Sequence, residues 1–382
     1  MYKVPAKNVK DRITGPFFQG KDTSVNGYRM GFLPLAYPLL GSRCYSLPQI
    51  KVLMGKVIDI HCHAAGIGAG NSGCFISPAM RRSFKFHIYL RAFGISEREL
   101  LAQGDHLIVE RLSALLAGAE RVQQAVVLAL DGVIDQNGEL DVARTEAFIP
   151  NEFIASAASR HDNILFGASI NPYRHDAIER LHQAVAQGAV LLKWLPSIQG
   201  IDPADERLVP FYECLRDQGL PLLTHTGEEE SFTCKQDHLG DPERLRLPLR
   251  VGVTVIAAHA ASNGKNYGEA NFNRFLRLCA EFPNLYADVS ALTQLNRLNH
   301  LPRLLKHREL HGRLLYGTDM PLLQTLIVTP LAFAHRLSPR KVLAISHIRN
   351  PWDQDIALKE ALGLPENVLT NAARILRLPA GA

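Results

Sequence analysis

The stretch from Val57 to His63 reads Val-Ile-Asp-Ile-His-Cys-His, a β-branched apolar run that closes on two histidines. Side chains alternate between the two faces of a strand. The alternation predicts that Asp59, His61 and His63 share one face, while Cys62 points to the other. Two imidazoles on one face converge, and each neutral ring brings a donor and an acceptor that need partners. Chance or surface placement also produces a lone His-x-His, so the metal-site interpretation depends on residues further along the chain.

Short β-rich runs follow at intervals that settle to roughly 30 residues, the length of a strand plus a crossover helix. The predicted strands are Val57–His63, Ala125–Asp131, Ile164–Ile170, Val190–Leu195, Pro221–His225, Thr254–His259, Leu285–Val289 and Leu314–Asp319. Helical periodicity fills several of the gaps, at Arg174–Gln187, Asp205–Gln218 and Phe272–Phe282. Eight such units over about 260 residues predict an α/β fold, a (β/α)8 TIM barrel. A doubly wound open sheet is disfavoured because it would gather its polar residues at one switch point.

The chain divides into two predicted parts. Residues 1–50 lack periodicity and are interpreted as an N-terminal extension packed on the barrel, and residues 51–382 as the barrel domain with extra C-terminal helices. Within the barrel domain, the segment Asn71–Arg91 carries the basic and aromatic run Arg81–His87. We interpret this segment as a lid or substrate loop, with nucleic-acid contact as the less favoured alternative.

The composition is that of a soluble enzyme. Among 382 residues, 47% are hydrophobic and 21% charged, and the net charge of +5 is too modest to argue for nucleic acid. The six cysteines form no Cys-x-x-Cys pair, which favours a reducing compartment, and no run is long enough to span a bilayer. We therefore expect a cytoplasmic protein that acts on a small molecule and has no nucleic-acid or membrane partners. A monomer and a homo-oligomer are both compatible with the sequence.

Four further polar residues fall at the ends of later strand-like runs: Lys193, His225, His259 and Asp319. A barrel would bring them to one mouth together with the two histidines of the first run. Imidazole and carboxylate ligands without paired thiolates favour Zn, Mn, Fe or Co, with Zn the most common. Taken singly, each histidine is equally explained as a hydrogen-bonded core residue, and Asp319 as the N-cap of a helix after Pro321.

Lys193 lies in an apolar strand, with Leu191 and Leu195 expected on its own face. Burial lowers the pKa of an ammonium, so the side chain needs a carboxylate partner or a chemical change. The neutral amine could add carbon dioxide, and the resulting carbamate could bridge two metals. The alternative is an ordinary lysine paired with Asp319 or Glu228.

The residue order resembles the amidohydrolase superfamily, and within it the amidohydrolase-related branch often called amidohydrolase 2. The resemblance covers roughly residues 55–378 and rests on the motifs Val57–His63, Lys193–Pro196, Tyr316–Pro321 and Asn371–Arg374. It implies a metal-dependent TIM barrel, in agreement with the strand count.

The resemblance also implies roles for the site residues. His61, His63 and Asp319 match the ligands of a first metal, and His225 matches a strand-five ligand. His259 matches either a second-metal ligand or a catalytic histidine, while Lys193 matches a lysine that is carboxylated in two-metal members. One or two divalent metals, most commonly Zn, are therefore expected, with a slight preference for two.

The leading functional hypothesis is a metal-dependent hydrolase of an amide, ester or lactone bond. A metal would lower the pKa of a water, and Asp319 would accept its proton. The runner-up is a one-metal decarboxylase of an aromatic or unsaturated acid, with His259 as proton donor and a cation such as Arg91 holding the carboxylate. A non-catalytic, metal-stabilised scaffold is the third alternative. The acidic run Glu228–Glu230 and the basic lid point to substrates of opposite charge, so the sequence leaves the substrate open.

Overall fold

The computed structural model describes residues 55–233, 235–325 and 327–379. Eight parallel strands form one sheet in the order β1-β3-β5-β6-β7-β8-β11-β12. Backbone hydrogen bonds from Ile60 N to Tyr316 O (3.1 Å) and from His63 N to Met320 O (2.8 Å) join the last strand region to the first. The sheet is thus a nearly closed barrel, and the predicted (β/α)8 TIM-barrel fold is confirmed.

Each of the eight predicted runs overlaps one barrel strand, although the observed strands are shorter. They are β1 (Ile58–His63), β3 (Gln124–Leu128), β5 (Ile164–Ala168), β6 (Leu191–Trp194), β7 (Leu222–Thr224), β8 (Val255–Ala257), β11 (Leu285–Asp288) and β12 (Leu314–Leu315). Four two-residue strands form separate hairpin-like pairs: β2 (Phe75–Ile76) with β4 (Ala147–Phe148), and β9 (Lys265–Asn266) with β10 (Glu269–Ala270). The site residues His225, His259 and Asp319 therefore follow their strands rather than end them.

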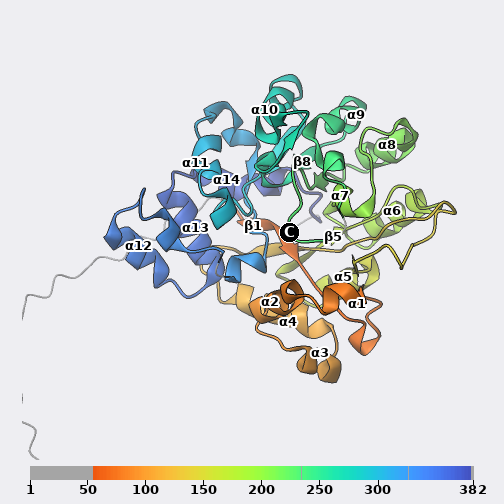
Figure 1. Ribbon diagram of the computed structural model, residues 1–382, viewed down its shortest axis with the longest axis horizontal. Helices are drawn as coiled ribbons and strands as arrows, with labels where there is room; N and C mark the ends of the chain where they lie inside the picture. The colour runs from red at the N-terminus through yellow and green to blue at the C-terminus, as the bar shows by residue number, and fades with distance from the viewer. Residues whose placement is uncertain (1–54, 234, 326, 380–382) are drawn as a thin grey trace, which may run out of the picture. The chain divides into compact units, whose positions relative to one another are not determined.

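Figure 1 shows the helices arranged around the labelled strands β1, β5 and β8. The α-helices are α1 (Pro78–Arg81), α2 (Phe84–Ala92), α3 (Glu97–Gln103), α4 (His106–Ala117), α5 (Asn151–Ala158), α6 (Ala177–Ala186), α7 (Pro196–Gln199), α8 (Val209–Asp217), α9 (Arg246–Val251), α10 (Asn271–Glu281), α11 (His300–Leu304), α12 (Pro339–Ser346), α13 (Pro351–Ala361) and α14 (Glu366–Thr370). Two short 3-10 turns carry site residues: η5 (Ala258–Ala261) carries His259 and η6 (Leu295–Arg297) carries Arg297. The turn η8 (Leu322–Gln324) follows the last strand region, and η10 (Asn371–Arg374) follows α14.

The barrel interior is apolar at the N-terminal ends of its strands. Inward residues from seven strands form one buried cluster: Ile58, Ile60, Val126, Leu128, Leu165, Leu191, Leu223, Ile256 and Leu315. Ala372 and Leu376, from η10 and just beyond it, join that cluster, and Asn371 Nδ2 donates to Leu314 O over 2.8 Å. The C-terminal segment therefore closes one end of the barrel, which leaves the strand C-termini as the end available for a site.

The first strand departs from the predicted alternation. Its register against β3 shifts between Asp59 and Cys62. Asp59 accepts hydrogen bonds from Cys62 Sγ (3.0 Å) and from Trp352 Nε1 in α13 (2.7 Å), so it faces the surrounding helices. The prediction that Asp59 shares a face with the two histidines is therefore wrong. An irregular residue in a strand changes which side its neighbours point to, and here it turns His61 and His63 to the mouth.

Within the described residues, no helix is long and apolar enough to cross a membrane. The expected N-terminal extension, residues 1–50, lies outside the described residues.

Candidate metal centre

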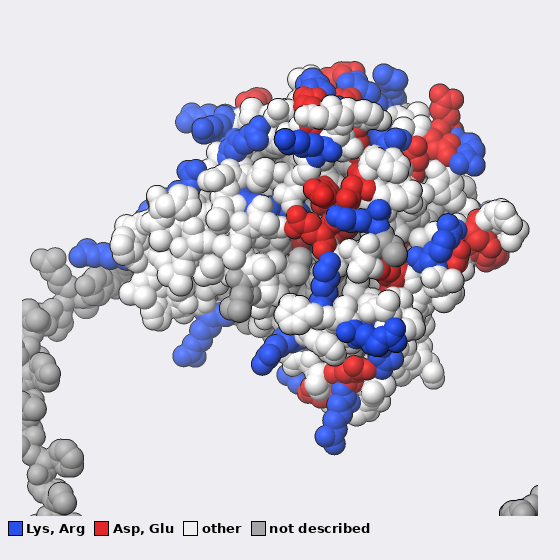
Figure 2. Space-filling model, viewed as in Figure 1, with Lys and Arg blue, Asp and Glu red and all other residues white. Residues whose placement is uncertain are grey.

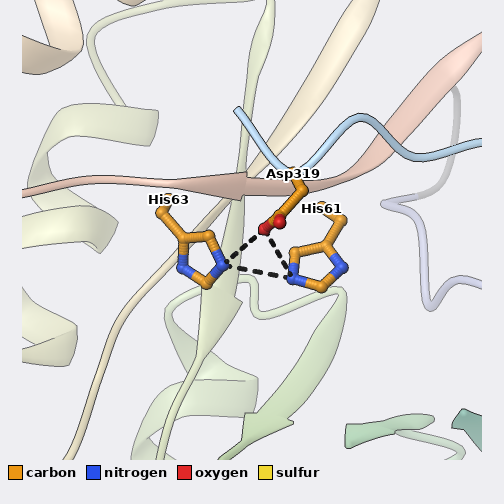
Figure 3. A group of neighbouring side chains, drawn as sticks. All are labelled: His61, His63 and Asp319. Atoms are coloured by element: carbon orange, nitrogen blue, oxygen red, sulfur yellow. Dashed lines mark hydrogen bonds and ion pairs between the residues drawn. The ribbon is translucent and has the colours of Figure 1, made fainter. Parts of the chain in front are cut away.

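Three side chains from the two ends of the barrel sheet converge at the mouth (Figure 3). His61 and His63 come from β1, and Asp319 comes from the segment after β12. Their ligand atoms lie close together: His61 Nε2 is 3.2 Å from His63 Nε2, and Asp319 Oδ1 is 3.2 Å from His63 Nε2 and 3.7 Å from His61 Nε2. The His63 side chain is 29% exposed, whereas His61 is buried, so solvent reaches the group from the His63 side.

These separations fit a divalent metal. Bonds of about 2.0–2.1 Å place neighbouring ligand atoms roughly 3.0 Å apart in octahedral and roughly 3.3–3.4 Å apart in tetrahedral geometry. The separations of His63 Nε2 from His61 Nε2 and from Asp319 Oδ1 are both 3.2 Å and lie in this range, and the third, between Asp319 Oδ1 and His61 Nε2, is longer at 3.7 Å. The set of two imidazoles and one carboxylate leaves further coordination positions for water or substrate, as catalytic sites require.

Asp288, at the end of β11, fixes the orientation of His61. Its Oδ2 lies 2.7 Å from His61 Nδ1, and its Oδ1 accepts from the backbone N of His259 at 2.8 Å. A proton on His61 Nδ1 leaves Nε2 with its lone pair, the tautomer that a ligand needs. Burial, with a smaller effect from the charge of Lys193, lowers the pKa of His61 to about 4, so the ring is neutral at physiological pH.

Asp319 reaches the histidines through an unusual backbone conformation. Its φ is 67°, in the left-handed region, and its N donates to His61 O over 2.9 Å. Burial raises the pKa of Asp319, but the hydrogen bond with His63, and then the charges that the neighbouring histidines carry when they are protonated, outweigh it and hold that pKa well below its usual range. The carboxyl is therefore ionised. The alternative role as a helix N-cap is wrong, because Pro321 occupies that position of η8 and no side chain caps it.

The chain passes close to the site at Gly317, two residues before Asp319. A Cβ built on Gly317 would lie 3.2 Å from the Cβ atoms of both His61 and Ser290. This is tighter than ordinary contact, so a side chain at Gly317 would press on the histidine.

Lys193 points into the same group. It is 1% exposed, and its Nζ lies 3.0 Å from His61 Nε2. Burial lowers the pKa of Lys193 to about 8, although the charges of Asp288 and Asp319 act in the opposite direction. Among the described residues no carboxylate forms an ion pair with this ammonium, so the expected pairing with Asp319 or Glu228 is not found.

The neighbours of Lys193 also differ in part from expectation. Leu191 lies in the barrel interior as predicted, but Leu195 packs in the outer hydrophobic core. Leu195 lies beyond the end of β6, where the strict alternation of a strand no longer applies.

His225 and His259 lie beside the three-residue group rather than within it. The His259 ring stacks on His61 with centroids 5.1 Å apart, and the His225 ring meets His259 edge-on at 5.2 Å. His259 Nδ1 is held by Ser290 at 2.8 Å from its Oγ, and His225 Nδ1 lies 3.4 Å from Glu229 Oε2. His225 Nε2 is buried and has no hydrogen-bond partner, which leaves it available to a ligand.

The described structure holds two groups of potential ligands. One is His61, His63 and Asp319, and the other is His61, His259 and Asp288. The second differs from the predicted second-metal set of His225, His259 and Lys193. Asp288 in that group already bonds His61 Nδ1 and the His259 backbone, so its oxygens orient the histidines.

Sequence reasoning missed two charged residues beside the group. Asp288 closes a recognised strand-like run, so its position at a strand end was a usable signal. Arg297 lies in η6, follows no strand, and has no comparable signal. Arg91, by contrast, is exposed on α2 and lines a surface pocket of about 320 Å³ that contains none of the clustered residues.

The segment Asn71–Arg91, which we interpreted as a lid or substrate loop, approaches the site through Tyr89 rather than Arg91. Tyr89 of α2 is near enough to Asp319 and Glu229 that their charges, after the larger effect of burial, raise its phenol pKa. Lys85 Nζ in the same helix donates to Glu230 O over 2.7 Å. Figure 2 shows acidic side chains gathered near the middle of this face with basic ones beside them, which gives no single-sign surface for nucleic acid.

The fold is a TIM barrel, and the two histidines and the carboxylate that converge at its mouth form a candidate metal centre. A family model described as amidohydrolase matches residues 58–336. The chain belongs to this amidohydrolase family, as the resemblance of its motifs predicted.

Solved structures agree on the fold. An uncharacterised TIM-barrel protein from Bordetella bronchiseptica is 18% identical, with a TM-score of 0.50 over 84% of this chain and 100% of that chain. A probable 2-pyrone-4,6-dicarboxylic acid hydrolase from Acinetobacter baumannii, with citric acid bound, is 13% identical, with a TM-score of 0.51 over 84% of this chain and 98% of that chain. A 5-carboxyvanillate decarboxylase from Sphingomonas paucimobilis is 12% identical, with a TM-score of 0.42 over 85% and 99%. No curated protein matches the chain.

Proposed function

We propose that the protein is a metal-dependent hydrolase that cleaves an ester, lactone or amide bond of a small molecule. The observation that carries the proposal is the set His61, His63 and Asp319, with ligand atoms 3.2–3.7 Å apart and one side open to solvent. A divalent metal held there, most commonly Zn, would polarise a carbonyl and lower the pKa of a water.

The protein's own residues supply the proton chemistry. Asp319 is ionised, so its carboxylate can accept the proton that a water loses on attack. His259 is neutral, because burial first and the charge of Arg297 second lower its pKa well below its usual range. Ser290 holds His259 Nδ1, which keeps the ring from turning. His259 is therefore placed beside the group to pass a proton to the leaving atom.

A single-metal centre is the stoichiometry that we favour. His61, His63 and Asp319 form it, and the unpartnered Nε2 of His225 is available to complete it. Lys193 then remains an unmodified ammonium beside His61, whose Nε2 would bind the metal in place of the hydrogen bond from Lys193 Nζ. This differs from the slight preference for two metals expected from the sequence, because none of the three-residue ligand groups among the described residues contains both His225 and His259.

A decarboxylase is the second candidate, and one observation favours it. His259 stands next to the metal-ligand group but outside it, as a proton donor to carbon would. The two reactions differ in product. Lactones, esters and amides that release acid support hydrolysis, whereas aromatic and unsaturated acids that release carbon dioxide support decarboxylation.

The test uses the full chain loaded with Zn, Mn or Fe and both substrate panels. Turnover on the first panel that disappears in Asp319→Asn and His259→Asn, with metal content retained in the latter, is the expected result. Carbon dioxide release alone would replace hydrolysis by decarboxylation. Absence of turnover on both panels at full metal occupancy would contradict the enzyme proposal and favour the non-catalytic scaffold.

We further propose that the substrate is a small molecule, that the protein has no nucleic-acid or membrane partners, and that it works in the cytoplasm. Homo-oligomer formation is compatible with this proposal. The interspersed charges of the face in Figure 2 support the second point. Loss of turnover upon adding nucleic acid, or sedimentation with vesicles, would count against it.

A further inference from the structure

Arg297 is a buried cation without a full set of partners. It ends η6, in the segment after β11, and it is 6% exposed. Its Nη1 donates to Ser262 Oγ over 2.8 Å, and its Nε is buried with no hydrogen-bond partner. Among the described residues no carboxylate forms an ion pair with it. A guanidinium carries five N–H donors, so this one is left with unused capacity in a place that water scarcely reaches.

The arginine is hydrogen-bonded to the end of the turn that carries His259, and the His259 ring stacks on His61. Ser262, its hydrogen-bond acceptor, caps the η5 turn that carries His259, and Ser262 N donates to His259 O over 3.0 Å. Charge effects agree with this placement. After the larger effect of burial, the charge of Arg297 lowers the pKa of His259, and it also contributes to the lowered pKa of His225.

The nearby acids have other partners. Glu229 accepts from Ser231 N at 2.7 Å, and Glu230 accepts from the side-chain amides of Asn263 and Asn296. Asp319, which also lies at the mouth, would bind the metal through its carboxylate. None of them closes a two-point contact with Arg297.

Arg174, another buried arginine, provides a comparison because it has a carboxylate partner. Arg174 donates from Nε and Nη2 to the two oxygens of Asp131, over 2.7 and 2.6 Å. That fork is the geometry in which a guanidinium binds a carboxylate most strongly. Arg297 is buried to a similar degree, but its Nε has no acceptor.

We propose that Arg297 binds a carboxylate of the substrate and so directs the protein toward anionic substrates. The inference rests on the proposed function, because it names the substrate class of the same site. The substrate's carboxylate supplies the acceptor that Arg297 lacks, and it anchors the molecule while the bond to be broken lies over His61, His63 and Asp319. Arg297 is thus a specificity-determining residue, and the exposed Arg91 is not.

The test compares matched substrates and matched variants. Each lactone or amide is presented as its free carboxylate and as the primary amide of that carboxylate, so that only the charge and acceptor change. Loss of charge-assisted hydrogen bonds costs roughly 10²-fold, so we expect the native protein to prefer the carboxylate form by about that factor in kcat/KM. Arg297→Gln should remove the preference, mainly through KM, and Arg297→Lys should retain part of it. Arg340→Gln, an exposed arginine on α12, is the control and should behave as the native protein does.

A binding measurement separates this inference from the proposed function. Metal-free protein is titrated calorimetrically with acetate, benzoate and glutarate, and with benzamide as the neutral control. We expect the native protein and Arg340→Gln to bind at least one carboxylate, and Arg297→Gln to lose that binding, even if neither reaction panel gives turnover. Equal binding by Arg297→Gln, no binding of any carboxylate by the native protein, or no preference within substrate pairs would overturn the inference. Should Arg297→Gln fail to fold, Arg297→Lys and the native preference decide it.

Discussion

Among the described residues two lysines are buried, and their surroundings are opposite. Lys359 of α13 is fully buried, and its Nζ donates to Asp355 Oδ2 and to Gly317 O, both over 2.7 Å. Tyr316 places its ring 5.0 Å from the same ammonium and donates its hydroxyl to Asp355. Lys193 has only the ring nitrogen of His61, at 3.0 Å.

The difference separates charges that hold the fold from charges that await a ligand. A buried ion pair with all its partners is costly to break, because removing one member leaves the other charge uncompensated. A buried cation without a counter-ion is disfavoured until something binds. Lys193 and Arg297 are both of this second kind, and both lie beside His61, His63 and Asp319. Substitutions at these residues test the contrast.

The largest effect is expected at the mouth. Asp319→Ala, His61→Ala and His63→Ala should each lose most of the metal and lower kcat by roughly 10²–10⁴-fold or more, since the proton acceptor or its metal is removed. The barrel should remain folded by circular dichroism, because its core lies at the other end. Glu213→Ala, an exposed acid on α8, is the control. Unchanged metal content by elemental analysis in all three variants would contradict the site.

The two lysines should differ in stability when each is replaced by methionine. Lys359→Met leaves Asp355 buried and unpaired, and we expect a loss of about 3–5 kcal/mol in the free energy of unfolding. Lys193→Met removes a charge without a counter-ion, so it should be at least as stable as the native protein at pH 7, though impaired in activity. Urea denaturation of metal-free protein measures both. Equal destabilisation by the two changes would erase the distinction.

The pH dependence of stability sharpens the comparison. The folded-state pKa of Lys193 is about 8, below the ordinary value of 10.5. Below pH 8 both the folded and the unfolded state carry the proton, and the full cost of burying the charge is present. Between pH 8 and 10.5 the unfolded state binds more protons, so the native free energy of unfolding should rise relative to that of Lys193→Met, by up to roughly 3 kcal/mol. A flat difference across that interval, in metal-free protein, would show that Lys193 is not buried as a lone cation.

The smallest effect is expected at Asp288, which orients a ligand without binding metal itself. Asp288→Asn should weaken metal affinity by roughly 10–100-fold, because the amide no longer fixes the Nδ1 proton of His61. Competition with a chelator of known affinity measures the change. Affinity equal to that of the native protein would place Asp288 outside the site, while complete loss of metal would make it a ligand.

Much of the site followed from strand periodicity. The eight runs placed His61, His63, Lys193 and Asp319 at one end of the barrel, because parallel strands all end at the same rim. The sequence pattern did not predict the local backbone geometry. Asp59 turned to α13 because the register of β1 shifts, and a pattern of residue types carries no sign of such a shift. Asp319 reaches its partners only through a left-handed φ.

The repeated apolar runs were sufficient to predict the barrel, and the residues that follow them were sufficient to predict the histidine, lysine and aspartate side chains at its mouth. The sequence did not show which of the buried cations have a carboxylate partner. Whether Lys193, Lys359, Arg174 or Arg297 has a carboxylate opposite it depends on segments far apart in the chain that folding brings within hydrogen-bonding distance. Asp288, more than 200 residues after His61, became its partner in this way, over 2.7 Å.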